Sequence, residues 1–454
     1  MSGTHVQRMT QGAIWKHIVK FAIPLFFGRL FQQLYNVVDS LVVGNFLGSE
    51  ALAAVSSSSS LIFLITGLFQ GTFIGAGVVI SRYWGAQDDR NVSLSIHTAT
   101  MFGLISGIVL SIVGVAFAPV ILQWMGTPQD VLPLSTRYFR VYFAGVLSVV
   151  MYNTSNGIFN ALGDSRHPLY HLILSSVLNV ILDLLFVGLL GFGITGAAAA
   201  TVIAQSISAA LGFYKLARTT EVYKISLRKL RVHLPLLKQI LHLGIPSGVQ
   251  NSITSLANVV VQSHINAFGT LAMAGCGAYS KVEGFAFLPI MAFSMAMTTF
   301  IGQNLGAQQY ERAKKGAAFG IVSCVILAEL VGITINLLSP QLIALFNNDP
   351  AVIAHGVSQA KTVTLFYFLL AISHGMAGVM RGAGKAIVPM VVMMVCWCLI
   401  RVSYITIITP VIGTIQSVFW AYPLTWTLST ICFLVYYFKV DWVHSYRAPE
   451  QRHA

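Results

Sequence analysis

Charged residues are scarce in this chain. Only 9% of its 454 residues are Asp, Glu, Lys or Arg, whereas soluble globular domains carry about 25%. Hydrophobic residues make up 56% of the chain, and they form runs of about 20 residues, which is the length a helix needs to cross a bilayer. The composition therefore excludes a soluble domain and predicts an integral membrane protein.

Cysteine is scarce as well. The five cysteines include no CxxC pair, so neither a zinc site nor a disulfide framework is indicated. The first 17 residues lack a short apolar core followed by a small-residue cleavage site, and we expect no removable signal peptide. GFGITG (191–196) matches a dinucleotide fingerprint but has no strand before it. No nucleophile elbow occurs either, so we expect no cofactor and no enzyme.

The apolar runs predict an all-α membrane protein with twelve transmembrane helices, because strands cross a membrane only as closed barrels. The expected spans are 18–46, 52–80, 93–118, 131–158, 168–190, 194–217, 239–267, 273–300, 314–338, 352–378, 387–409 and 413–438.

Lys and Arg are confined to alternate connections. They are absent from the loops around 119–130 and 339–350, for example, and present in the run RKLRVHLPLLK (228–238). The positive-inside rule then places both termini in the cytoplasm of a multi-pass protein of the cell membrane. The net charge of +13 could indicate nucleic acid, but basic loops beside anionic lipid account for it. We expect no nucleic-acid partner.

The two halves of the chain repeat each other. Pro24 in KFAIPLFFG pairs with Pro246 in HLGIPSGVQ, and 246 − 24 = 222. NGIFNALGDSRHP (156–168) pairs with AGVMRGAGKAIVP (377–389), and 389 − 168 = 221. Such a repeat predicts two pseudo-symmetric six-helix lobes, as in secondary transporters that bind cargo between their halves. The expected parts are an amino-terminal lobe (1–217), a cytoplasmic linker (218–238), a carboxy-terminal lobe (239–438) and a cytoplasmic tail (439–454).

Two acids break the repeat. Asp39 lies in LYNVVDSLVVG and Asp183 in LNVILDLLFVG, and adding 221 leads to Val260 and Tyr404. An ionised Asp inside a membrane costs about 2.5 to 3.5 kcal/mol by insertion scales, and intramembrane acids are functional by default. A functional site that belongs to one lobe only would explain why these acids occur in one half of the repeat.

Other polar residues are expected at the same depth in the membrane as these two acids. Asp39, Asp183 and Thr201 each lie seven residues from the expected outer end of a span, or about 10 Å below the surface. Asn179 lies one turn from Asp183 on the same helix face. Oxygen-rich groups of this kind suit Na⁺ or a shared proton. The alternative is that each acid pairs separately with a buried Arg or lines water.

These segments, together with the paired GAQ loops, SNGIFNALGD and GITGAAAAT, resemble the multidrug and toxic compound extrusion (MATE) family over essentially the whole chain. The resemblance implies a functional monomer that exports lipophilic, often cationic compounds in exchange for inward Na⁺ or H⁺. It implies a coupling site, with Na⁺ or a proton bound, and neighbouring cavity positions. The coupling residues are Asp39, Asn179, Asp183 and Thr201, and the cavity positions are Tyr35, Asn153 and Asn156.

The spans 239–267 and 352–378 contain no Asp or Glu, which favours the DinF-like over the NorM-like branch of that family. We expect helix 1 to bend near Pro24, where the ring removes a backbone hydrogen bond. Glu283 is a second candidate for the carboxy-lobe cavity, with an internal ion pair as the alternative. Arg140 and Lys361 differ by 221, which indicates a structural role such as snorkelling.

His167 and His171 stand four residues apart, and we interpret them as interfacial polar residues because a third metal ligand is lacking. The rival function is a lipid-linked saccharide flippase of related two-lobed architecture, which would need basic residues in the cavity; Arg140, Lys361 and Arg401 are the candidates. A channel is the third alternative.

Overall fold

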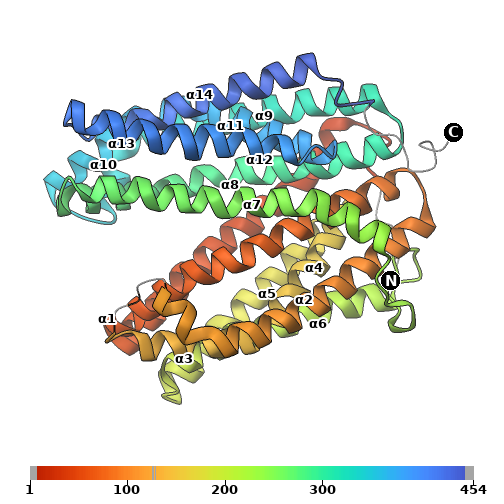
Figure 1. Ribbon diagram of the computed structural model, residues 1–454, viewed down its shortest axis with the longest axis horizontal. Coiled ribbons are helices and arrows are strands. Elements are labelled where there is room, and N and C mark those ends of the chain that lie inside the picture. The colour runs from red at the N-terminus through yellow and green to blue at the C-terminus, as the bar shows by residue number, and fades with distance from the viewer. Residues whose placement is uncertain (1–7, 125–126, 128, 445–454) are drawn as a thin grey trace. The chain divides into compact units, whose positions relative to one another are not determined.

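The computed structural model describes residues 8–124, 127 and 129–444, apart from some side chains between residues 40 and 68. Within these residues every regular element is a helix, as the sequence predicts, and no strand occurs. The helices, labelled in Figure 1, are α1 (Ile14–Gly85), α2 (Asp89–Trp124), α3 (Leu132–Ala144), α4 (Val146–Leu162), α5 (Arg166–Asp183), α6 (Gly193–Arg218), α7 (Leu234–Asn266), α8 (Thr270–Gly306), α9 (Tyr310–Ala344), α10 (Pro350–Val363), α11 (Tyr367–Gly382), α12 (Ile387–Met393), α13 (Arg401–Ile412) and α14 (Gln416–Lys439).

Short π-helical or 3₁₀-helical turns interrupt several of these helices. Two of them are π-helical, Leu184–Leu189 after α5 and Met394–Ile400 between α12 and α13. In α1 the backbone leaves the helical region only at Gly48, with φ 85° and ψ −176°, a conformation that is essentially restricted to glycine. Gly48 therefore divides α1 into two rods joined by a kink.

In the described part of the chain, eight helical segments are long and apolar enough to cross a membrane. The prediction of an all-α membrane protein is therefore confirmed. The two rods of α1, the pair α3 and α4, and α7 are the other long helical segments. Gly145, with φ −105° and ψ 6°, separates α3 from α4. It packs closely against α6, since a Cβ there would lie 2.0 Å from Val202 Cγ1.

The chain forms two compact units. Unit 1 contains Arg8 and Phe27–Ile245, and unit 2 contains Met9–Phe26 and the chain from Pro246 onward. Each unit thus includes a piece of the other sequence half, and the changeover falls near Pro24 and at Pro246. The core of unit 2 includes Ile18.

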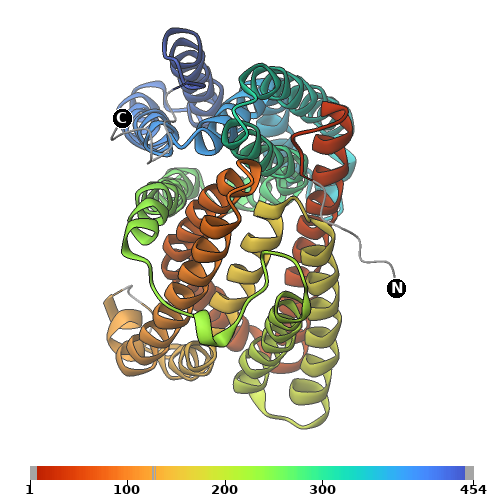
Figure 2. The same ribbon diagram turned by 90° about the vertical axis from the view of Figure 1, so that its right-hand side faces the viewer.

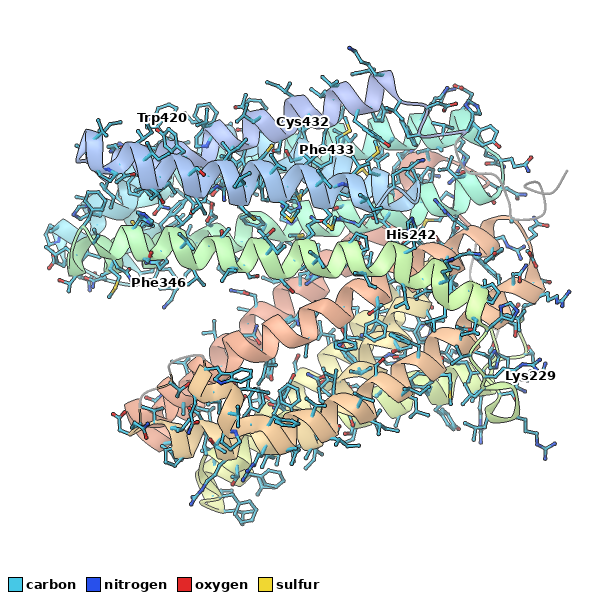
Figure 3. The ribbon with its side chains drawn as sticks, in the orientation of Figure 1. Lys229, His242, Phe346, Trp420, Cys432 and Phe433 are labelled. Carbon is cyan, nitrogen blue, oxygen red and sulfur yellow. The ribbon has the colours of Figure 1, made fainter. Side chains whose placement is uncertain are left out.

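In unit 1, α2, α4, α5 and α6 run side by side (Figure 1). The connection between α6 and α7 crosses the ends of these helices (Figure 2) and includes Lys229 (Figure 3). Two backbone amides hold it to α2: Ser226 N donates to His97 Nε2 at 3.1 Å and His233 N donates to Thr98 Oγ1 at 3.2 Å. The connection between the two sequence halves is therefore fixed to unit 1.

In unit 2, α8 packs against α9, α10 and α11. Phe346 and Trp420 lie at the same end of this unit (Figure 3). At the other end of α9, Arg312 donates hydrogen bonds to the backbone carbonyls of Met9, Gln11 and Gly12. These charge-assisted bonds attach the start of the chain to unit 2.

Candidate functional site

The predicted coupling residues come from three helices of unit 1. Asn179 and Asp183 lie on the buried face of α5 and are only 2% and 1% exposed. Thr201 is buried on α6, and Asp39 is half-buried on α1. The π-helical turn begins directly after Asp183, and such bulges are frequent at functional sites because they re-aim the neighbouring side chain.

Asn179 joins Asp183 to Thr201. When its amide is assigned from its partners, the nitrogen donates to Asp183 Oδ2 at 2.8 Å, and the oxygen accepts from Thr201 Oγ1 at 3.2 Å. Tyr35, one turn before Asp39 on α1, also hydrogen-bonds Thr201. The structure therefore brings the four predicted coupling residues and one predicted cavity residue into a single cluster.

The carboxyl groups of Asp39 and Asp183 form a hydrogen bond. Asp183 Oδ1 is buried, and no described N–H or O–H group donates to it. Two carboxyl groups can share a hydrogen bond only if one of them is protonated, because two like charges at this separation repel strongly. The pair therefore offers a place for one proton, or for a small cation in its stead.

Two tyrosines form part of the surroundings of the acids. Tyr138 and Tyr142, from α3, are 6% and 8% exposed, and Tyr138 interacts electrostatically with Asp39 and Asp183. The sequence pattern alone identifies neither tyrosine as a site residue, although their spacing of four residues places them on one helix face.

The other predicted amino-lobe residues lie outside this hydrogen-bonded cluster. Asn153 donates to Val149 O on its own helix at 2.8 Å, and Asn156 is half-buried on α4. At Pro24 the backbone of α1 stays helical. The hinge at Pro24 and the cavity roles of the two asparagines stay predictions.

Glu283 belongs to a separate polar cluster in unit 2. Its Oε1 accepts hydrogen bonds from the hydroxyls of Tyr279 at 3.4 Å and Tyr367 at 3.5 Å. The Arg401 guanidinium donates to Thr425 Oγ1 at 2.8 Å. In the part of the chain that the structure describes, no salt bridge joins Glu283 to Arg401, so the arrangement differs from a closed internal ion pair.

The two histidines lie at the start of α5. His171 is only 8% exposed, so it packs inside unit 1, and its depth at the membrane interface stays a prediction. It contacts Phe159 edge to face, with ring centroids 5.8 Å apart, and the His167 ring lies 6.3 Å away. Sequence spacing places a residue on a helix face, but which face packs inward depends on the neighbouring helices.

Comparison with known proteins matches this chain to one family of proteins over most of its length. The MatE family model matches residues 24–185 and again residues 246–407, in the register of the repeat, since 246 − 24 = 222 and 407 − 185 = 222. A Bacillus subtilis (strain 168) protein named probable multidrug resistance protein YoeA is 30% identical over 396 residues, covering 85% of each chain. A Thermotoga maritima protein named probable multidrug resistance protein NorM is 26% identical over 84% of this chain and 82% of its own.

The fold has solved counterparts. A structure described as the outward-facing conformation of a multidrug resistance MATE family transporter superposes with a TM-score of 0.88 at 25% identity, and the match covers 97% of this chain and 98% of that one.

Proposed function

Because this chain belongs to the MatE family, whose members are membrane transporters and not enzymes, we propose that it is a secondary active multidrug efflux antiporter. It exports lipophilic, often cationic small molecules and takes up H⁺ or Na⁺ in exchange. The names of its relatives as multidrug resistance proteins support the class of cargo. The observation that carries the coupling is the hydrogen-bonded pair of Asp39 and Asp183 inside unit 1.

The proposed architecture has twelve spanning helices in two six-helix lobes, with cargo bound between the lobes. The loops rich in Lys and Arg face the cytoplasm, and both termini lie on that side of the cell membrane. The absence of Asp and Glu from residues 239–267 and 352–378 supports a DinF-like assignment.

The coupling cation binds from outside, between Asp39 and Asp183. It neutralises the carboxylate that stays charged when the pair shares one proton, and it changes the hydrogen bonds to Asn179 and Thr201. The first rod of α1 then bends near Pro24, where one helical hydrogen bond is lacking. With neutral cargo, one inward charge contributes about 2.3 kcal/mol per 100 mV of membrane potential. With monovalent cationic cargo a one-for-one exchange moves no net charge, and the concentration gradient of the coupling cation drives it.

The Asp39→Asn substitution tests this assignment, because Asn keeps the size of the side chain and removes its charge. We expect it to abolish ethidium efflux from proteoliposomes under separately imposed Na⁺ and pH gradients, while the purified protein keeps its melting temperature. Asp130→Asn is the matched control, since Asp130 is exposed in a loop. Efflux by Asp39→Asn at the wild-type rate would refute the proposed coupling site.

A further inference from the structure

The buried face of α5 is polar over its whole length. Its buried residues are Pro168, His171, Ser175, Asn179 and Asp183. The last four follow one another at intervals of four residues, and this spacing places them one above another on a single helix face. The opposite face carries exposed Leu174, Val177 and Ile181, as expected for a face in contact with lipid. The polar row therefore points into the helix bundle.

The row continues to the end of unit 1 where the basic loops lie. His167 Nδ1 contacts Asp164 Oδ2, and Asp164 Oδ1 accepts the backbone N–H of Arg166 at 3.0 Å. The His167 and Asp164 side chains are 27% and 11% exposed, whereas Asp183 at the other end of the row is 1% exposed. We call Asp183, Asn179, Ser175, His171, His167 and Asp164 the polar column.

Neighbouring helices add polar atoms beside the polar column. Ser208 on α6 donates to His171 O at 2.9 Å. Apart from the carboxyl–carboxyl contact with Asp39, two buried polar atoms of the column have no hydrogen-bond partner among the described residues: Asp183 Oδ1 and His171 Nδ1. Each buried group left unpaired would cost about 1 to 3 kcal/mol, and such groups in proteins are commonly satisfied by internal water.

The spacing within the column suits bridging water molecules. Residues four apart rise about 6 Å along a helix, and the rings of His167 and His171 lie 6.3 Å apart. Asn179 and Asp183 hydrogen-bond directly. The separation of the two histidine rings exceeds a direct hydrogen bond, and water molecules that make two hydrogen bonds each can bridge such a gap. The column can therefore form a continuous hydrogen-bonded chain.

The second half of the sequence lacks the histidines, the serine and the acid of this column. Adding 221 to positions 167, 171 and 175 gives Val388, Val392 and Cys396. The family model pairs residue 185 with residue 407, an offset of 222, which takes Asn179 to Arg401 and Asp183 to Ile405. The offset is 221 at Pro168 and Pro389 and 222 at the end of the family match, and the π-helical turn Met394–Ile400 lies between these two points. If the polar face of α5 were needed only for packing the six-helix unit, both halves would keep it. Instead it accompanies the two acids, which points to a shared function.

We propose that the polar column releases the coupling proton from Asp183 toward the basic-loop end of unit 1, by a route separate from that of the cargo. This inference rests on the proposed antiport and assigns H⁺ as its coupling ion. Asp183 gives up its carboxyl proton and becomes a carboxylate. Water and the Ser175 hydroxyl pass the proton on, and the His171 ring accepts it at one nitrogen and releases it at the other.

Charges of both signs lie beside His171: a protonated His167 repels a proton on the His171 ring, and the Asp164 carboxylate attracts one. These two groups are the electrostatic partners of His171, while α6 presents Ser208 and α4 presents Phe159 to it. Burial raises the pKa of Asp164, but hydrogen bonds from His167 outweigh burial and hold this pKa below its ordinary value. Asp164 is therefore an anion at neutral pH and attracts a proton to the exposed end of the column.

Two isosteric substitutions at Ser175 test the proposal. Valine and threonine have the same shape, so they strain the site equally, but only threonine keeps a hydroxyl. Proteoliposomes containing pyranine and ethidium report proton entry and dye exit together under an imposed pH gradient. We expect Ser175→Val to slow both fluxes about a hundredfold relative to Ser175→Thr, the lower end of the range for a lost proton-transfer group, while ethidium binding to the detergent-solubilised protein is unchanged.

His171→Gln gives a second, independent readout. It removes the titratable ring, and we expect a similar loss that added imidazole restores, because a free imidazole can carry the proton in its place. His242→Gln is the control, since His242 is exposed on α7 outside the column (Figure 3), and we expect it to transport at the wild-type rate.

Each other outcome counts against the proposal. Equal fluxes in the valine and threonine variants, or a His171→Gln defect that imidazole leaves unchanged, would overturn the column while the efflux function stands. Wild-type efflux driven by Na⁺ without proton movement would do the same. Absence of wild-type efflux under both gradients would overturn the proposed function and, with it, the inference.

Discussion

Thr201 links α6 to the acid site through a single hydroxyl group. This hydroxyl contacts both the Asn179 amide and Tyr35. The Asn179 amide in turn donates to Asp183. The position of one carboxylate therefore depends on a neutral residue 18 positions further along the chain, since 201 − 183 = 18.

Thr201→Val should weaken the coupling site without removing a charge. Valine has the same shape as threonine but removes the hydroxyl that donates to the Asn179 oxygen and hydrogen-bonds Tyr35, while the backbone N–H of residue 201 still donates to that oxygen. For Asn179 the loss is that of one hydrogen bond, about 0.5 to 1.5 kcal/mol. We expect the external cation concentration for half-maximal dye efflux to rise by up to about tenfold. Thr201→Ser should stay near the wild-type value. A valine variant with an unchanged half-maximal concentration would exclude Thr201 from the coupling site.

At the scale of elements, glycine controls how closely α8 and α10 approach each other. A Cβ built at Gly275 would lie 2.4 Å from Val352 O and 3.0 Å from Gly356 N, both backbone atoms that cannot rotate away. Two residues along α8, a Cβ at Gly277 would meet no atom within 4 Å. Small residues allow such close backbone contact between helices in membranes.

This pair of glycines gives a matched test of helix packing. Alanine in a helix is favoured over glycine by about 1 kcal/mol, so Gly277→Ala should maintain or raise the melting temperature in detergent. Gly275→Ala should lower it, because α8 and α10 must separate to admit the methyl group. If both variants melted at the same temperature, the backbone contact between α8 and α10 would be refuted.

At the scale of the whole molecule, the two compact units do not coincide with the two halves of the repeat. Unit 2 includes Met9–Phe26, and unit 1 includes the start of α7 up to Ile245. In unit 1 this start of α7 packs closely: a Cβ at Gly244 would lie 2.5 Å from Thr72 Cα. Each unit therefore needs a segment from the other half of the chain to complete its core.

The exchange of segments predicts how the protein tolerates a cut. When residues 1–221 and 222–454 are produced as separate chains in one cell, we expect them to assemble and restore dye efflux. Either fragment alone should be degraded, because one unit lacks the start of α7 and the other lacks Met9–Phe26. Immunoblots of membranes and drug-resistance assays measure both results. A stable fragment in the absence of its partner would contradict this account of the two units.

The sequence by itself determined that this protein lies in a membrane, that it is all-helical and that its two halves repeat each other. These properties depend on composition and on spacing along the chain, and hydrogen bonding within lipid leaves few alternatives to helices. The same spacing placed Asn179 and Asp183 on one helix face. It also indicated that Asp39 and Asp183 belong to one lobe only, because adding 221 leads to Val260 and Tyr404.

Contacts between helices were decided only by the tertiary structure. Asp39 and Asp183 are 144 residues apart in sequence, since 183 − 39 = 144, and their hydrogen bond depends on the rotation of α1 about its axis, which spacing leaves open. For the same reason the burial of His171, and with it the polar column, could not be predicted. Which face of a helix packs inward depends on the shapes of the neighbouring helices, and those shapes form only when the whole bundle assembles.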